Sequence, residues 1–186
     1  MSSSKEAILA AARRTAQARG YGGLNFRDLA SEVGIKAASI HYHFPSKADL
    51  GAAVARRYWE DTAACLEALS ADTSEPLDSL RRYPGTFRKA LENDNRMCLG
   101  SFMAAEYDDL PEPVKHEVTT FAQVNVAWLS KTLSAAAVAA PEASERRARA
   151  IFAAVAGAQL MARSRADLSF YDELIDSYRE AGLLPA

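Results

Sequence analysis

The most distinctive side chains of this sequence lie between residues 36 and 47, where small, hydroxyl, aromatic and basic residues are interleaved. At 100° per residue, one side of a helix over 36–44 is expected to face inward and carries Ala37, Ile40, His41 and Phe44. The opposite side carries Ala38, Ser39, Tyr42 and His43, with Lys36 on its flank. Small residues let a helix backbone approach the floor of a DNA groove, and polar residues can contact base edges or phosphates. The pattern therefore predicts a helix that binds nucleic acid.

A second short helix is needed to position this surface. Residues 26–33 follow Asn25, a favourable N-cap, and precede Gly34, which tolerates the left-handed conformation at a helix end. Two helices of about eight residues joined by a glycine-containing turn are typical of a helix-turn-helix motif.

The motif as a whole resembles the DNA-binding domain of the TetR family of bacterial transcriptional regulators. The resemblance covers about residues 5–54 and is carried by Leu29-Ala30, Val33-Gly34-Ile35, Ala38-Ser39-Ile40, Tyr42, Phe44-Pro45-Ser46-Lys47 and Leu50. The sequence departs from the family pattern at three positions: Asn25 replaces the usual threonine, Ala38 a common glycine and His41 a common tyrosine.

The resemblance implies that double-stranded operator DNA is a partner. The residues that it implies bind DNA are Asn25, Arg27, Lys36, Ala37, Ala38, Ser39, Tyr42, His43 and Lys47. Asn25 and Arg27 are expected at the backbone of one strand, and Lys47 at a phosphate, assisted by the N–H groups that begin its helix. Two alternatives remain open at this point: Tyr42 can be a half-buried packing residue, and Lys47 a solvated lysine. His41 is expected to be structural.

The composition indicates an all-α protein. Alanine occurs 38 times among 186 residues, whereas valine and isoleucine together occur 13 times, and alanine favours helices while β-branched residues favour sheets. About nine helices are predicted, over 4–19, 26–33, 36–44, 47–69, 76–92, 96–109, 112–139, 143–166 and 171–182. Pro84 is expected to kink or split the fifth, because proline lacks a backbone N–H.

The charge and hydropathy patterns exclude several other classes of protein. Residues 1–50 carry a net charge of +3 and the remainder −5, which suits a protein that meets phosphate at one end, although chance can produce the same difference. No apolar run approaches the roughly 20 residues of a membrane span, and the first residues do not resemble a secretory signal. We therefore expect a cytoplasmic protein with no membrane partner.

The cysteines and histidines do not predict a metal site. Cys65 and Cys98 form no C-x-x-C motif, and His41 and His43 point about 200° apart on a helix. We expect neither a metal nor another cofactor.

The chain is expected to divide into a helix-turn-helix DNA-binding domain over 1–50 and an effector-binding and dimerisation domain over 51–186. Large apolar side chains of the second domain that can line a small-molecule pocket are Trp59, Phe87, Cys98, Phe102, Met103, Tyr107, Phe121 and Trp128. Candidate polar contacts for such a ligand are Tyr83, Glu106, Gln123 and Asn125. Solid packing explains the same spacing, but the family resemblance favours a pocket for an inducer, with an apolar or aromatic ligand preferred.

Cys98 provides an alternative means of regulation. It lies just inside a predicted helix amino terminus and near Arg96, and both features favour the reactive thiolate of a redox or electrophile sensor. The opposing interpretation is that Cys98 is a small, buried hydrophobic residue with no sensing role. A remote alternative is a thiol-dependent enzyme that uses Cys98 and His116, but no orienting third group or oxyanion-hole loop is recognisable, so we expect no catalytic residues.

The last two predicted helices are expected to form a dimer interface, because recurring small residues let helices approach closely. The residues predicted at this interface are Ala150, Ala153, Ala154, Gly157, Leu160, Met161, Leu174 and Tyr178. Ordinary intramolecular packing is the alternative, but a helix-turn-helix protein gains useful specificity from two half-sites. The combined prediction is a homodimeric, ligand-responsive DNA-binding regulator, most consistent with a repressor that a small-molecule inducer releases from its operator.

Overall fold

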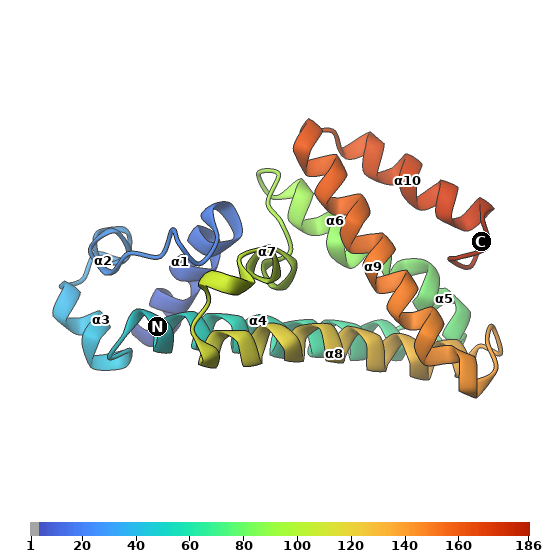
Figure 1. Cartoon of the computed structure of the whole chain (residues 1–186), viewed down its shortest axis with the longest axis horizontal. Coiled ribbons are helices and arrows are strands. Elements are labelled where there is room, and N and C mark those ends of the chain that lie inside the picture. The colour runs from blue at the N-terminus through green and yellow to red at the C-terminus, as the bar shows by residue number, and fades with distance from the viewer. Residues whose placement is uncertain (1–3) are drawn as a thin grey trace. The chain divides into compact units, whose positions relative to one another are not determined.

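Residues 4–186, which the computed structural model describes, form helices and no strands, as the alanine-rich composition predicts (Figure 1). The α-helices in this range are α1 (Ser4–Arg19), α2 (Phe26–Val33), α3 (Ala37–His43), α4 (Lys47–Ala71), α5 (Pro76–Arg82), α6 (Pro84–Glu92), α7 (Leu99–Ala105), α8 (Glu112–Ala135), α9 (Pro141–Arg165) and α10 (Leu168–Glu180). A short 3-10 helix, η1 (Tyr107–Asp109), follows α7. The fifth predicted helix is split into α5 and α6 because Pro84 cannot donate a helical hydrogen bond.

Local capping explains why α2 begins and ends where the sequence predicts. The side chain of Asn25 accepts hydrogen bonds from the N–H groups of Arg27 (2.8 Å) and Asp28 (3.2 Å). Gly34 adopts the left-handed conformation with φ 75°, and its N–H bonds the carbonyls of Ala30 and Ser31.

Other helix boundaries differ from the predicted ones where the chain turns in the left-handed region. Asp94 and Asn95 have φ values of 57° and 52°, so the helix predicted from residue 96 begins only at Leu99. Ala137, with φ 52°, lies beyond the early end of α8. Ala166 also lies in the left-handed region, with φ 51°. The next residue, Asp167, caps α10 three residues earlier than predicted, because its Oδ1 accepts from the N–H groups of Ser169 and Phe170.

The helices group into two compact units. The first unit contains the residues up to Glu60 together with Leu99–Phe121, and the second contains Asp61–Cys98 together with Ala122–Ala186. These compact units do not test the predicted division of function between residues 1–50 and 51–186, which stays a prediction. Residues 1–3 of the predicted first domain lie outside the described residues.

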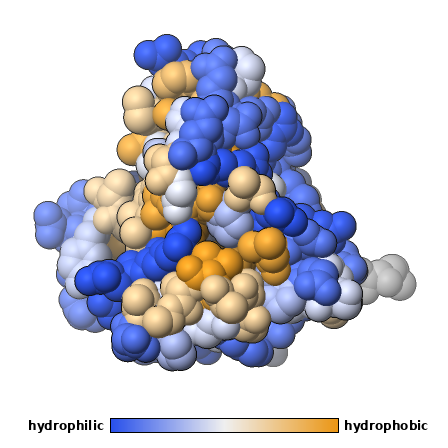
Figure 2. Space-filling view, turned by 90° about the vertical axis from the view of Figure 1, so that its right-hand side faces the viewer, coloured by the Kyte–Doolittle hydropathy of each residue, from blue (hydrophilic) through white to orange (hydrophobic). Residues whose placement is uncertain are grey.

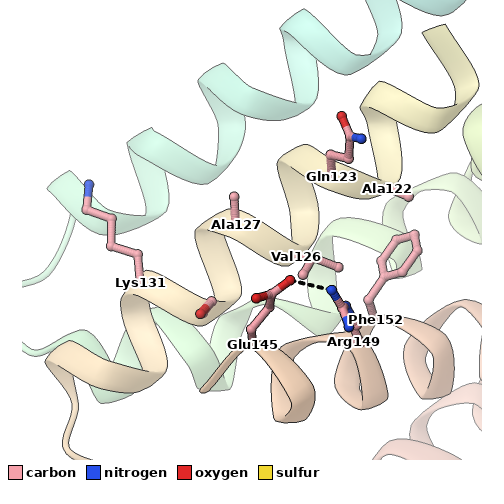
Figure 3. A pocket seen from close by; sticks show the side chains of 9 residues that line it. Ala122, Gln123, Val126, Ala127, Lys131, Glu145, Arg149 and Phe152 are labelled. Atoms are coloured by element: carbon pink, nitrogen blue, oxygen red, sulfur yellow. Dashed lines mark hydrogen bonds and ion pairs between the residues drawn. The ribbon is translucent and has the colours of Figure 1, made fainter. Parts of the chain in front are cut away.

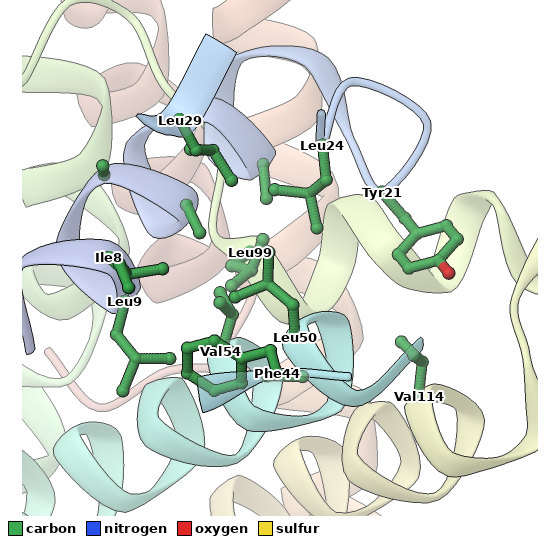
Figure 4. Close-up of a cluster of buried hydrophobic side chains, with 14 of the residues drawn as sticks. Ile8, Leu9, Tyr21, Leu24, Leu29, Phe44, Leu50, Val54, Leu99 and Val114 are labelled. Carbon is green, nitrogen blue, oxygen red and sulfur yellow. The ribbon is translucent and has the colours of Figure 1, made fainter. Parts of the chain in front are cut away.

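The core of the first unit supports the helix-turn-helix motif. Its buried apolar side chains come from α1 to α4, α7, α8 and the segments that connect them, and include Ile40. Figure 4 shows others of them, among them Ile8, Leu9, Leu29, Phe44, Leu50, Val54, Leu99 and Val114. An exposed ion pair between Arg14 of α1 and Glu32 of α2, 2.7 Å long, adds a polar contact at the edge of this core.

Buried polar side chains connect the helices of the second unit. The O–H of Tyr171 donates to the carbonyl of Pro84 (2.8 Å), and the O–H of Tyr83 donates to Oδ1 of Asn125 (3.0 Å). Gln159 on α9 accepts from the N–H of Cys98 (2.9 Å) and donates to the carbonyl of Phe87 (2.6 Å). Each bond satisfies a polar group that burial would otherwise penalise. Among residues 4–186, no helix is both long and apolar enough to cross a membrane.

Candidate nucleic-acid interface

Helix α3 presents a polar surface on a firmly packed base. Ile40 and Phe44 anchor it in the core with exposed fractions of 0% and 3%. Tyr42 points away from them and is 85% exposed, so it is not the half-buried packing residue considered above. The other predicted DNA-binding residues of this segment are exposed (Lys36, Ala37, Ala38) or half-buried (Ser39, His43).

Two residues of α3 lie elsewhere than the helical spacing predicts. Ala37 and His41 were expected on the inward side, but both are exposed. The helix has only seven residues, and in the segment 37–44 only Ile40 and Phe44 are buried. His41 instead sets its ring edge-on against Phe26, with ring centroids 4.6 Å apart.

The start of α4 carries a capping arrangement that was not anticipated. Ser46 Oγ accepts from the N–H of Asp49 (3.1 Å), and Asp49 Oδ2 accepts from the N–H of Ser46 (3.0 Å). This reciprocal pattern is a capping box, and the Ser-x-x-Asp spacing was its signal in the sequence. It uses the N–H of Asp49, one of the backbone donors at the start of α4 that were expected to assist phosphate binding.

Lys47, the first residue of α4, is half-buried and already has partners within the protein. Its Nζ donates to the carbonyl of Gly22 (3.1 Å) and lies 4.7 Å from the centroid of the Tyr21 ring. It is therefore not the freely solvated lysine that was the alternative interpretation. Asn25 and Arg27 at the start of α2 are both exposed.

The residues predicted to line a ligand pocket are distributed over both units. In the first unit, Met103 and Phe121 are buried, Phe102 is half-buried and Tyr107 is exposed. The indole N–H of Trp59 donates to Glu117 (2.7 Å). Burial alone would raise the pKa of Glu117, but the hydrogen bonds from Arg56 and Trp59 outweigh it and lower the pKa.

The remaining predicted pocket residues, Phe87, Cys98 and Trp128, lie buried in the second unit. Trp128 stacks on Tyr83 with ring centroids 5.7 Å apart, and its N–H donates to Ser70 Oγ (3.0 Å). Cys98 is 2% exposed. It is the residue immediately before α7, so it lies at the amino end of that helix rather than inside it.

The second unit contains a groove of about 760 Å³ between α8 and α9. It is lined by Ala122, Gln123, Val126, Ala127, Ser130 and Lys131 of α8 and by Glu145, Arg149 and Phe152 of α9 (Figure 3). Arg149 forms an ion pair with Glu145 at its edge. None of the large apolar side chains predicted to line a pocket lines this groove, but Gln123, one of the candidate polar contacts, does. Its signal in the sequence was a stripe of small residues at helical spacing on α8, which leaves space beside the Phe152 ring.

The residues predicted at a dimer interface form an incompletely buried stripe on α9 and α10. Leu160 and Met161 are 56% and 48% exposed, unusually high for large apolar side chains, and Ala150 and Ala153 are exposed. Ala154, Gly157, Leu174 and Tyr178 are half-buried, and a Cβ atom added to Gly157 would meet nothing within 4 Å. On the face of the molecule that Figure 2 shows, apolar side chains gather in a patch surrounded by hydrophilic ones. Such patches are typical of interaction surfaces.

Within residues 4–186, no three His, Cys, Asp or Glu side chains are close enough together to hold a metal ion.

A two-helix motif with a polar second helix, followed by a long helical region, is typical of DNA-binding transcriptional regulators. Residues 8–54 match the model of the bacterial regulatory proteins of the tetR family. The TetR transcriptional regulator from Legionella pneumophila is 32% identical, with a TM-score of 0.91 over 97% of this chain and 98% of that one. A TetR-family transcriptional regulator from Agrobacterium tumefaciens is 29% identical, with a TM-score of 0.88 over 96% of this chain and 97% of that one.

The chain therefore belongs to the TetR family of bacterial transcriptional regulators and is not an enzyme. No protein of curated function shows significant sequence similarity to it.

Proposed function

We propose that this regulator is a homodimeric repressor that binds operator DNA through residues 1–50 and is released by a small molecule bound to residues 51–186. The observation that carries the DNA-binding part is the exposed polar side of α3 on its buried Ile40–Phe44 base. A rigid base lets a helix enter the major groove without losing its position. Because an operator is chromosomal, the protein acts in the cytoplasm.

The proposed contacts divide into two kinds. Lys36, Ala37, Ala38 and Ser39 enter the major groove, where they meet base edges. Asn25, Arg27 and Lys47 contact the sugar-phosphate backbone, and Tyr42 and His43 lie at the boundary between the two. The side chain of Asn25 already caps α2, so its further contact with a phosphate uses its amide NH₂ group.

Dimerisation is supported by the stripe on α9 and α10. Its small residues let a second copy approach closely, and its exposed Leu160 and Met161 gain apolar contacts on association. The same surface on both copies gives a two-fold dimer. Two recognition helices then reach half-sites about one helical turn of DNA apart.

We propose the α8–α9 groove as the effector site. Its lining combines apolar Val126 and Phe152 with the cations Lys131 and Arg149, of which Arg149 is already paired with Glu145. This combination suits an apolar or aromatic ligand with an anionic group near Lys131. Release requires that the ligand prefer the state that does not fit the operator.

The DNA-binding part is tested by gel-shift titration of the purified protein against fragments of its own genome. A selected fragment should bind more tightly than random DNA, and Tyr42→Ala should weaken that binding. Tyr107→Ala is the matched control, because Tyr107 is also exposed but lies on η1. Equal binding of all fragments by wild type, or equal effects of the two variants, would contradict the proposal.

The effector site is tested with anilinonaphthalene sulfonate, an anionic aromatic probe whose fluorescence rises in apolar surroundings. The probe should bind the wild type and weaken operator binding, and Ala127→Trp should abolish both effects by filling the groove. Release that persists in Ala127→Trp would reject the groove as the effector site.

A redox or electrophile sensor acting through Cys98 remains the alternative mode of regulation. The burial of this thiol opposes it, since reactive cysteines are accessible.

A further inference from the structure

A carboxylate distant in sequence holds the turn that connects α1 to α2. Oε2 of Glu106, which lies between α7 and η1, accepts a hydrogen bond of 2.7 Å from the N–H of Tyr21. Its other oxygen is 3.5 Å from the N–H of Gly22. A Cβ atom on Gly20 would lie 2.2 Å from Oε1 of Glu106. Glycine at position 20 therefore makes room for the carboxylate, and its φ of 71° also favours glycine.

The same turn holds Lys47. The carbonyl of Gly22 accepts from its Nζ, and the ring of Tyr21 lies beneath the ammonium group. The Tyr21 ring is itself confined, because a Cβ atom on Gly51 of α4 would lie 2.6 Å from it. An unbroken series of contacts thus runs from Glu106 through Tyr21 and Gly22 to Lys47.

The turn also leads directly into α2. Leu24, whose N–H bonds the carbonyl of Tyr21 at 3.1 Å, is buried, and Asn25 then caps the helix. A shift of the turn therefore moves Lys47 on one side and the start of α2 with Arg27 on the other.

We propose that Glu106 is a positioning residue for DNA binding: it fixes the α1–α2 turn, and through the turn it orients Lys47 toward a phosphate of the DNA. This inference rests on the proposed function of the helix-turn-helix motif. Glu106 touches no DNA in this arrangement.

The effect arises from preorganisation. A lysine ammonium has three donors, and one of them is used on the carbonyl of Gly22, which leaves two for a phosphate. Because the side chain is already ordered, DNA binding costs less conformational entropy than it would for a free lysine. If Glu106 no longer holds the turn, Lys47 keeps its charge but loses its fixed position.

The negative charge of Glu106 should weaken DNA binding, whereas its positioning of the turn should strengthen it, and this opposition makes the inference testable. A carboxylate near a phosphate-binding surface repels DNA, so a role through charge alone predicts tighter binding when the charge is removed. A positioning role predicts weaker binding when the acceptor oxygens are removed. Glu106→Ala removes both charge and acceptors, whereas Glu106→Gln removes the charge and keeps one acceptor for the N–H of Tyr21.

The experiment measures operator and random-DNA affinities over a series of salt concentrations for the full-length protein. Glu106→Ala should lose about tenfold in affinity on both DNAs, as expected when about one ordering hydrogen bond is removed. The slope of log K against log salt should not change, because no DNA-contacting cation is lost. Glu106→Gln should stay within about threefold of wild type. Asp109→Ala, which removes an exposed carboxylate from the neighbouring η1, is the control and should not weaken binding.

Hydrogen exchange at the Tyr21 amide separates positioning from general loss of structure. Glu106→Ala should speed exchange at Tyr21 while the amides of α9 keep their protection. Equal or tighter DNA binding by Glu106→Ala, or a loss in Glu106→Gln as large as in Glu106→Ala, would overturn the inference. Failure of the wild type to bind any DNA would instead reject the proposed function.

Discussion

The indole N–H of Trp59 donates a hydrogen bond of 2.7 Å to Oε2 of Glu117, and Arg56 engages the other oxygen of the same carboxylate. Glu117 is almost completely buried, so these donors satisfy a charge that has little contact with water. The contact ties α4 to α8 within the first unit. It also gives Trp59, predicted as a ligand contact, a structural partner.

Glu117 should make stability depend on pH. Its pKa is lowered in the folded protein, so its contribution is present above the ordinary pKa of a glutamate, about 4.3, and is lost as pH falls through the lowered folded value. Glu117→Gln should therefore lower the free energy of unfolding by about 1–3 kcal/mol at pH 7, and by less below about pH 4. Urea unfolding at both pH values measures this. Glu112→Gln, exposed on the same helix, is the control, and an equal loss at pH 7 and pH 3 would contradict the prediction.

Lys47 should bind phosphate without discriminating between sequences. Lys47→Ala is expected to weaken binding about equally on operator and random DNA and to reduce the magnitude of the slope of log K against log salt by about one. Removal of Lys36 or Ser39 should instead cost about 1–3 kcal/mol on the operator and less on random DNA. Fluorescence anisotropy over a salt series gives all these quantities. An unchanged slope for Lys47→Ala would show that this cation meets no phosphate.

Gly157 offers a test of the dimer with little disturbance of the subunit. Nothing lies within 4 Å of an added Cβ atom there, so Gly157→Glu should leave the subunit folded. In a dry dimer interface the same side chain introduces both bulk and an unpaired charge, and sedimentation should therefore detect monomers. Gly85→Glu is the matched control, because Gly85 is a helical glycine with equally open surroundings. A dimer that persists in Gly157→Glu would exclude this interface.

The two cysteines should differ in reactivity in the order of their exposure. Cys98 is buried and Cys65 is half-buried, so iodoacetamide at neutral pH is expected to modify Cys65 first and Cys98 only on unfolding. Mass spectrometry of the digested protein, combined with operator binding, measures this. Rapid modification of Cys98 accompanied by loss of operator binding would support the sensor alternative instead.

The sequence by itself determined the elements that depend on near neighbours in the chain. Asn25 caps α2 by bonds to residues two and three positions away, and Gly34 ends it through its own left-handed conformation. Pro84 splits a helix through its missing N–H. The helix-turn-helix motif was predictable because its two helices are short, adjacent and defined by such contacts, together with the apolar positions Ile40 and Phe44.

Only the tertiary structure decided which polar side chains are used within the protein and which remain exposed. Glu106 reaches the N–H of Tyr21 across 85 residues, and Gln159 reaches the N–H of Cys98 across 61. Helical periodicity contains no information about such partners. Periodicity gives the direction in which a side chain leaves its helix axis, whereas burial depends on which other elements pack against that side of the helix. For this reason His41 lies exposed beside Phe26, and the groove opens beside Phe152, where small residues of α8 leave space that no neighbouring side chain fills.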